Sequence, residues 1–125
     1  MRPDPKTILV VDDDCDIRES IRMLLEDSAY RVAEAANGQE ALDYLRAADA
    51  LPNLILLDLV MPVMNGREFR ERQRAVSAWS AVPVFVLTAA TDIQERTAGM
   101  APDLVIPKPF DIDFLSAAIA AAVHP

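Results

Sequence analysis

Five polar residues each follow a short apolar segment of this chain, and their types suit the chemistry of phosphoryl groups. They are Asp12, Asp13, Asp58, Thr88 and Lys108. Converging carboxylates repel one another, and a hard cation such as Mg²⁺ relieves this repulsion while keeping positions open for water and phosphate oxygens. One carboxylate can also act as a nucleophile toward phosphorus and form an acyl phosphate. The lysine and the threonine would then bind two phosphoryl oxygens.

These side chains can meet only if the apolar segments before them are strands of a single sheet. Five segments are predicted as strands, namely Thr7–Val11, Tyr30–Ala35, Asn53–Leu57, Val82–Leu87 and Leu104–Ile106. Thr7–Val11 is short and continuously apolar, as is typical of a strand buried on both faces of a parallel sheet. Ligands of open α/β sheets bind outside the carboxyl ends of the strands, where the five polar residues lie. Each residue alone has an ordinary explanation as a cap, a turn or surface charge, but together they favour a site.

Helical periodicity fills the intervals between the predicted strands. Ile17, Ile21 and Leu24 recur on one helix face. The capping-box spacing of Asp16 and Glu19 places the start of this helix near residue 16. The other helices are predicted at Gln39–Ala48, Arg67–Ser77, Asp92–Ala98 and about Asp111–Val123. Because strands and helices alternate strictly, the sequence predicts a doubly wound α/β fold with five parallel strands and helices on both faces.

Residue counts exclude several other kinds of site. The chain has 125 residues with no internal repeat and no long linker, which predicts one domain. A single cysteine, Cys15, excludes an internal disulfide and a thiolate zinc site, and an inert role is expected for it. A single histidine, His124, argues against a histidine triad. The three glycines stand too far apart to form a phosphate-binding loop.

The charge and the hydropathy of the chain narrow its partners. Twenty acidic against twelve basic residues give a net charge of −8, which should repel nucleic acid and anionic lipid. Residues 1–6 contain no apolar stretch typical of a secretory signal. The longest apolar runs, Ala81–Leu87 and Ala117–Val123, are far shorter than the ~18 residues of a membrane span. We therefore expect a cytoplasmic protein that binds neither nucleic acid nor membranes directly.

Four segments together carry a family resemblance. They are ILVVDDD (Ile8–Asp14), LLDLVMPVMNG (Leu56–Gly66), VLTAA (Val86–Ala90) and PKPF (Pro107–Phe110). In this order and at these spacings, they closely resemble the receiver domain of bacterial two-component response regulators, including single-domain regulators of the chemotaxis type. The resemblance covers nearly the whole chain. It implies that residues 1–125 form one receiver domain with the flavodoxin-like strand order 2-1-3-4-5.

The resemblance implies how the acidic residues would act. Asp58 matches the family's phosphoacceptor, and Asp13 matches the carboxylate that binds Mg²⁺ directly. Asp12 would bind Mg²⁺ largely through water. Asp58 and the backbone carbonyl of Val60 would complete the metal ligands that the protein supplies. Asp14 is expected to be a solvated charge at the helix entry.

The resemblance also assigns the other two polar residues. Thr88 would be the switch hydroxyl and Lys108 the cation that pairs with phosphate, and the peptide before Pro109 is a candidate for the cis form. Many receivers carry an inward-turning Tyr or Phe where this chain has Val105. Because valine is short and β-branched, we expect signalling through Thr88 and the backbone of residues 89–98 instead.

The family resemblance implies partners and separates this chain from two alternatives. A sensor histidine kinase or a histidine phosphotransfer protein would supply the phosphoryl group, and a downstream effector or an appended output domain would respond. The domain would be a monomer or weak dimer, and a switch that catalyses only its own phosphorylation and dephosphorylation. A phosphohydrolase would need a second acid where Val60 stands. A flavin-binding module would need a hydroxyl-rich glycine loop, which the sequence lacks.

Two predicted helices carry features outside this scheme. Arginines alternate with glutamates in Arg67–Ser77, which predicts a solvated face whose charges pair with one another. These arginines are Arg67, Arg70, Arg72 and Arg74. The last helix is apolar all round from Ala117 to Val123. Two explanations stay open there: alanine simply forms helices well, or the helix offers a face to a partner, a second copy or a further domain.

Overall fold

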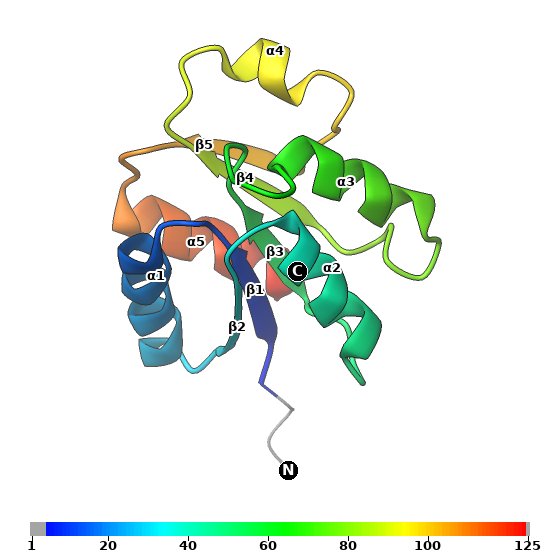
Figure 1. The fold of residues 1–125 in the computed structure, drawn as a ribbon. Coiled ribbons are helices and arrows are strands. Elements are labelled where there is room, and N and C mark those ends of the chain that lie inside the picture. The colour runs from blue at the N-terminus through cyan, green and yellow to red at the C-terminus, as the bar shows by residue number, and fades with distance from the viewer. Residues whose placement is uncertain (1–4, 125) are drawn as a thin grey trace.

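Strands and helices alternate along the chain in the computed structural model, which describes residues 5–124 (Figure 1). The strands are β1 (Thr7–Val11), β2 (Arg31–Ala35), β3 (Leu54–Leu57), β4 (Val84–Thr88) and β5 (Leu104–Pro107). The helices are α1 (Cys15–Asp27), α2 (Gly38–Ala47), α3 (Gly66–Ala75), α4 (Ile93–Thr97) and α5 (Ile112–Val123). The strands form a parallel sheet in the order β2-β1-β3-β4-β5. The predicted fold and strand order are confirmed.

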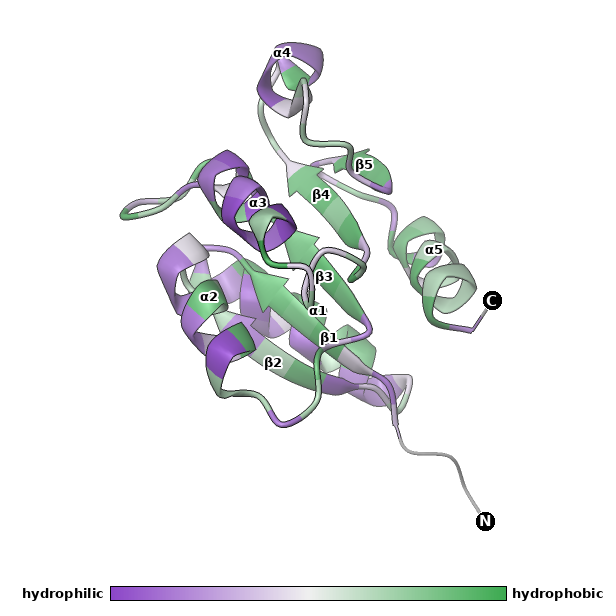
Figure 2. Ribbon diagram, turned by 90° about the vertical axis from the view of Figure 1, so that its right-hand side faces the viewer, coloured by the Kyte–Doolittle hydropathy of each residue, from purple (hydrophilic) through white to green (hydrophobic). Residues whose placement is uncertain are grey.

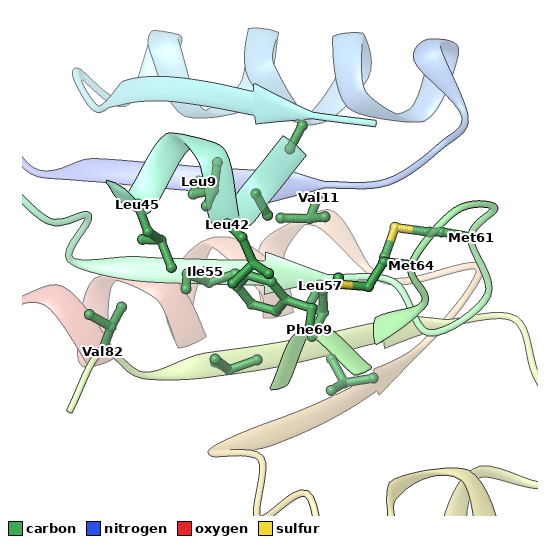
Figure 3. Packing of buried hydrophobic residues seen from close by; sticks show 14 of the residues in the cluster. Leu9, Val11, Leu42, Leu45, Ile55, Leu57, Met61, Met64, Phe69 and Val82 are labelled. Carbon is green, nitrogen blue, oxygen red and sulfur yellow. The ribbon is translucent and has the colours of Figure 1, made fainter. Parts of the chain in front are cut away.

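The sheet has a separate apolar core on each face. Alternate residues of a strand point to opposite faces. Leu9 and Val11 of β1 therefore join the cluster that includes residues of α2 and α3, whereas Ile8 and Val10 join the cluster that includes residues of α1 and α5. Figure 3 shows the first cluster, in which Phe69 of α3 lies among side chains from the strands and α2. Burial on both faces explains why the three central strands β1, β3 and β4 are almost entirely apolar, whereas the edge strand β2 contains Arg31 and Glu34.

The helix α4 contributes least to the core. Figure 2 shows hydrophobic strands and a largely hydrophilic α3, and both views place α4 beyond the edge of the sheet near β4 and β5. None of the five residues of α4 is buried. The helix is also shorter than the predicted span Asp92–Ala98. A helix this short gains little stability by itself, so α4 depends on bonds to its neighbours.

The first helix begins differently from its prediction. Asp14, and not Asp16, is the N-cap of α1, because the carboxylate of Asp14 accepts hydrogen bonds from the backbone amides of Asp16 (2.9 Å) and Ile17 (3.3 Å). Asp14 is exposed at the helix entry, as expected, and its carboxylate also caps the helix. The helix starts at Cys15, which is exposed. Satisfying the free amides of the first turn stabilises a helix by about 1 kcal/mol.

The predicted solvated arginine face of α3 was wrong for Arg70, whereas Arg72 and Arg74 are exposed as expected. Arg70 is only 6% exposed, and its guanidinium donates hydrogen bonds to the carbonyls of Met100 (2.9 Å) and Ala101 (2.8 Å). Arg67 and Arg74 donate to backbone carbonyls at the end of α4 and directly after it. The last carbonyls of a helix lack partners within that helix, and cationic side chains can supply them. The arginines of α3 therefore hold the α4 end rather than pairing only with neighbouring glutamates.

The last helix buries one face only. Leu115, Ile119 and Val123 are buried against the sheet, whereas Ile112 and Phe114 are 57% and 54% exposed. The apolar character of α5 thus extends to side chains that solvent reaches. Both explanations of this apolar surface remain predictions.

Candidate functional site

The carboxyl ends of β1 and β3 bring two of the predicted aspartates together. The two strands are neighbours, with Val11 paired to Leu57. The backbone amide of Asp58 donates to the carbonyl of Val11 (2.9 Å), and the amide of Asp12 donates to the carbonyl of Ala35 in β2 (3.0 Å). Sheet hydrogen bonding therefore continues one residue beyond each strand. It fixes the backbone of both aspartates.

Three carboxylates form one cluster at this edge of the sheet. Asp12, Asp13 and Asp58 each place a carboxylate oxygen within 4.8 Å of the others. Asp12 and Asp58 are buried, whereas Asp13 is exposed. The structure thus brings together the three predicted carboxylates and uses the next residue, Asp14, as the cap of α1.

Lys108 completes the charged part of the site. Its Nζ lies 2.7 Å from Asp12 Oδ2 and 3.6 Å from Asp58 Oδ2. The backbone amide of Lys108 donates to the carbonyl of Thr88 (2.8 Å), which ties the end of β5 to the end of β4. The peptide between Lys108 and Pro109 is cis, as predicted. The lysine ammonium is therefore directed toward two of the three carboxylates.

Asp58 is the carboxylate whose ionisation the fold opposes. Burial raises the pKa of Asp58 most, and the charges of Asp12 and Asp13 raise it further. The Lys108 ammonium and a hydrogen bond from the amide of Leu59 (2.8 Å) lower the same pKa and offset only part of this rise. A cation at the cluster would favour the ionised form. The charge balance of the site therefore suits a bound metal ion.

The donor set fits Mg²⁺ in particular. Carboxylate and carbonyl oxygens are the ligands that this hard cation prefers, and it commonly keeps several water molecules. The cluster supplies carboxylate oxygens from two strand ends, and the exposed position of Asp13 leaves room for water and phosphate. No nitrogen or sulfur ligand takes part in the described cluster. The acidic triad can therefore bind a metal of this class.

The loop after β3 (residues 58–65, called the β3–α3 loop) is held against α3 by a close backbone contact. The amide of Gly66, the first residue of α3, donates to the carbonyl of Leu59 (3.0 Å). A Cβ atom at Gly66 would collide with the carbonyl oxygen of Asp58 and lie 3.0 Å from the Cα atom of Leu59. Only glycine fits there. The sequence showed Gly66 as part of a motif but could not show which backbone lies opposite it.

A second helix holds the other part of the β3–α3 loop. The amide of Gly38, the first residue of α2, donates to the carbonyl of Met64 (2.9 Å), and a Cβ at Gly38 would lie 2.7 Å from Met64 Cγ. Met61 and Met64 are buried, and Figure 3 shows them directed toward the core beside Leu57. Between these anchors, Val60 is exposed. The loop is therefore fixed by packing on both sides of the predicted carbonyl ligand.

Thr88 lies at the end of β4 and is almost fully buried. Its Oγ1 accepts a hydrogen bond from the backbone amide of Ala90 (3.1 Å), so the hydroxyl is bonded to the segment that follows the strand. The residue is paired with Pro107 of β5, directly before Lys108. The structure thus places Thr88 at the correct strand end, with its hydroxyl proton available to another acceptor.

An apolar groove lies beside the charged cluster. It has a volume of about 590 Å³ and is lined by residues of α1, of the β5–α5 connection and of the start of α5, together with Ala89. Its walls include Ile17 from α1, Ile112 from α5 and Lys108 itself. The groove therefore leads from an open surface toward the lysine of the site.

Comparison with protein families decides the kind of protein. The profile of the response regulator receiver domain matches residues 8–120. The chain belongs to the response regulator receiver family. In this family, the acidic pocket beside Lys108 is typical of a phosphoacceptor site. The protein is a receiver domain of two-component signalling, and such a domain is a phosphorylation switch rather than a turnover enzyme. A receiver domain implies a histidine kinase as its partner.

Curated relatives and solved structures agree with this receiver assignment. The chain is 40% identical to the response regulator MprA of Mycolicibacterium vanbaalenii, an alignment that covers 96% of this chain and 51% of that protein. It is 38% identical to the response regulator Rre1 of Synechocystis sp., with 93% of this chain and 51% of that protein covered. This receiver chain thus spans about half the length of these relatives.

Similar solved structures include a chemotaxis response regulator and a signal receiver domain. The chemotaxis response regulator CheY4 of Vibrio cholerae superposes with a TM-score of 0.85 at 30% identity, covering 95% of this chain and 99% of that one. The signal receiver domain of a histidine kinase from Syntrophus aciditrophicus gives a TM-score of 0.88 at 26% identity, covering 95% and 90%. Within residues 5–124 of this receiver, no helix has the length and apolar character to cross a bilayer.

Proposed function

We propose that Asp58 accepts a phosphoryl group from a phosphohistidine and that Mg²⁺ assists the transfer. The observation that carries this proposal is the position of Asp58, which is buried between two further carboxylates and lies 3.6 Å from the Lys108 ammonium. Asp12, Asp13, Asp58 and the backbone carbonyl of Val60 would hold the metal. Bound Mg²⁺ would neutralise the negative charge that develops on the phosphoryl oxygens.

The two oxygens of Asp58 have different surroundings, which supports attack by Oδ2. Oδ1 accepts the amide hydrogen of Leu59 (2.8 Å), whereas Oδ2 lies on the side of Lys108. In the proposed step, Oδ2 forms a bond to phosphorus while the bond from phosphorus to the histidine nitrogen breaks. The nitrogen keeps the electron pair and is protonated from water. The product is an acyl phosphate on Asp58 and a free histidine.

Lys108 and Thr88 would bind the transferred group. The ammonium is already beside Asp58 and can pair with one phosphoryl oxygen. The Thr88 hydroxyl, which accepts from the amide of Ala90, keeps its own proton to donate to another oxygen. Formation of that bond would pull on residues 89 and 90. The chemistry at Asp58 would thereby reach the segment after β4.

Substitution of Asp58 tests the assignment directly. We expect Asp58→Asn to abolish the Mg²⁺-dependent, acid-labile and hydroxylamine-sensitive label that acetyl phosphate leaves on the wild-type chain. Asp13→Asn should keep the acceptor but weaken Mg²⁺ binding and slow labelling. Asp14→Asn is the matched control, because Asp14 caps α1 and lies outside the cluster. Equal labelling of Asp58→Asn and wild type would overturn the proposal.

The groove between α1 and α5 is proposed as the docking surface of the histidine-bearing donor. It is apolar, exposes Ile112 and includes Lys108 in its wall, so a partner seated there would present a phosphohistidine at the site. Ile112→Glu should slow transfer from a phosphorylated histidine phosphotransfer protein at least tenfold while acetyl phosphate still labels the variant. Phe114→Glu is the control, because Phe114 is equally exposed on α5 but does not line the groove. Equal slowing by both variants would contradict this docking site.

The remaining expectations follow from membership of the family. We propose that the phosphorylated domain acts in the cytoplasm as a monomer or weak dimer, without direct contact to nucleic acid or membranes. A downstream effector, or an output domain in the same polypeptide, would read its state. The net charge of −8 supports a protein partner rather than nucleic acid. Analytical ultracentrifugation with and without acetyl phosphate would measure the oligomeric state.

A further inference from the structure

Arg18 of α1 is bonded to the backbone of the acidic cluster. Its Nη1 donates to the carbonyl oxygen of Asp12 at 2.6 Å, and its Nε donates to Glu34 of β2 at 3.3 Å. The side chain of Arg18 is only 18% exposed. Arg22, one turn later, donates to the other oxygen of Glu34 at 2.8 Å. The two arginines share one carboxylate, but only Arg18 reaches the cluster.

The bond from Arg18 completes the fixation of Asp12. The amide of Asp12 is held by Ala35, Oδ1 accepts from the amide of Asp14 (2.9 Å), and Oδ2 accepts from Lys108 (2.7 Å). The carbonyl oxygen is the remaining polar group, and Arg18 binds it. Each polar group of Asp12 therefore has a partner on a different part of the fold.

The carbonyl of Asp12 matters because it belongs to the peptide that leads into Asp13. A peptide unit is planar, so a bond that orients the Asp12 carbonyl also orients the amide of Asp13 and the start of its main chain. Asp13 is the exposed member of the cluster. The direction of its side chain therefore depends on the backbone that Arg18 holds.

We propose that Arg18 is a positioning residue for the cation site. By fixing the peptide between Asp12 and Asp13, it keeps the Asp13 carboxylate directed toward Asp58. The inference rests on the proposed function, because it takes the three carboxylates as the Mg²⁺ site. It adds a residue outside the cluster, bonded through the main chain, on which Mg²⁺ affinity depends.

The direction in which Mg²⁺ affinity changes when Arg18 is substituted separates a positioning role from a purely electrostatic one. A cationic guanidinium near three carboxylates opposes the binding of a second cation, so loss of its charge alone would strengthen Mg²⁺ binding. Loss of the bond to the Asp12 carbonyl would loosen Asp13 and weaken binding. Substitution of residues that orient metal ligands commonly costs tenfold or more in metal affinity. The two roles therefore predict opposite changes.

Calorimetric titration with MgCl₂ tests this prediction on three variants of the full chain. Arg18→Met, which has similar length but no charge and no donor, should weaken Mg²⁺ binding about tenfold. Arg18→Lys, which keeps the charge and one donor group, should recover part of that loss. Arg22→Met is the matched control, because it removes the same charge from the same helix and a bond to the same glutamate. It should leave the affinity unchanged or slightly higher.

Amide exchange tests whether Arg18 holds the backbone, and the variant Asp13→Asn tests whether the carboxylates bind Mg²⁺ at all. Exchange at the amides of Asp13 and Asp14 should accelerate in Arg18→Met and stay unchanged in Arg22→Met. If Asp13→Asn weakens Mg²⁺ binding and Arg18→Met does not, the positioning role is wrong and the proposed site stands. If Asp13→Asn has no effect either, the proposed Mg²⁺ site itself fails. If Arg18→Met does not fold, Arg18→Lys is measured alone, and an affinity equal to wild type would then overturn the inference.

Discussion

The β3–α3 loop and the segment after β4 leave neighbouring strands at the same edge of the sheet, but they are held in different ways. The β3–α3 loop carries two buried methionines and is bonded to the first residues of α2 and α3. The segment after β4, residues 89–99 (called the α4 segment), contains a helix without a buried residue. Packing fixes the loop that holds Asp58.

The α4 segment is held at its end by hydrogen bonds from α3. Arg67 Nη2 donates to the carbonyls of Arg96 (3.1 Å) and Ala98, and Arg74 Nη1 donates to the carbonyl of Gly99 (2.8 Å). Such exposed hydrogen bonds contribute far less than buried apolar side chains, so the segment belongs to the low-stability part of the molecule. The comparison indicates that the site is rigid where it would bind the phosphoryl group and less stable where it would report it.

Substitution of Gly66 should have the largest effect. In Gly66→Ala, the new Cβ collides with the carbonyl oxygen of Asp58. We expect a loss of about 3 kcal/mol in the free energy of unfolding, together with loss of labelling by acetyl phosphate. Gly99→Ala in the α4 segment is the control: no atom lies within 4 Å of the added Cβ, and the φ of +79° costs about 1 kcal/mol. Equal losses in urea unfolding of the two variants would break the comparison.

The response to phosphorylation should depend on Thr88 and not on Val105. In wild type, a phosphoryl mimic such as beryllofluoride should shift NMR signals mainly across residues 89–98. Thr88→Ala should remove most of that shift, because the hydroxyl bonded to the Ala90 amide is lost. Val105→Ala should keep it and cost about 1 kcal/mol in stability, since Val105 packs against the core only in part. Loss of the response in both variants would contradict transmission through the α4 segment.

The arginine bonds of α3 should control local opening of the α4 segment. In the double variant Arg67→Ala/Arg74→Ala, amide exchange across residues 93–99 should accelerate about tenfold while exchange in β1 and β3 stays unchanged. Arg72→Ala, which removes an exposed arginine from the same helix, is the control. Slower or unchanged exchange in the double variant would mean that other contacts hold the segment.

The charge on Asp58 should produce the smallest effect, a shift in the pH dependence of stability. Because its pKa is raised by burial and by Asp12 and Asp13, ionisation of Asp58 destabilises the folded state at neutral pH. Asp58→Asn should therefore raise the unfolding midpoint at pH 7, and the gain should shrink as the pH falls through the raised pKa. Added Mg²⁺ should also reduce it by stabilising wild type. A gain that is independent of pH would contradict this origin.

The strand ends could be predicted from the sequence because their signal is local. An apolar run followed by a polar residue places that residue at the sheet edge, and Asp12, Asp58, Thr88 and Lys108 all lie there. The order of the strands followed from the family resemblance alone, since periodicity says nothing about which strands are neighbours. The sequence therefore predicts which residues lie at the site, but it does not predict the distances between them or the shifts in their pKa values.

The missed features are contacts with backbone atoms, which a sequence of side chains does not show. Arg70 is bonded to carbonyls 30 and 31 residues away, and backbone carbonyls leave no mark in the sequence. The neighbouring glutamates offered a plausible local partner instead. The same reason hid the contact of Gly66 with Asp58 and the bond of Arg18 to the Asp12 carbonyl.

The attachment of α4 through carbonyl oxygens has an evolutionary consequence. Arg67 binds the main chain at residues 95 and 96, and the exposed side chain of Glu95 takes no part in this attachment. Substitutions there change the surface that α4 offers while the helix stays in place. Duplicated genes can thus diverge in this surface while the acidic cluster stays unchanged.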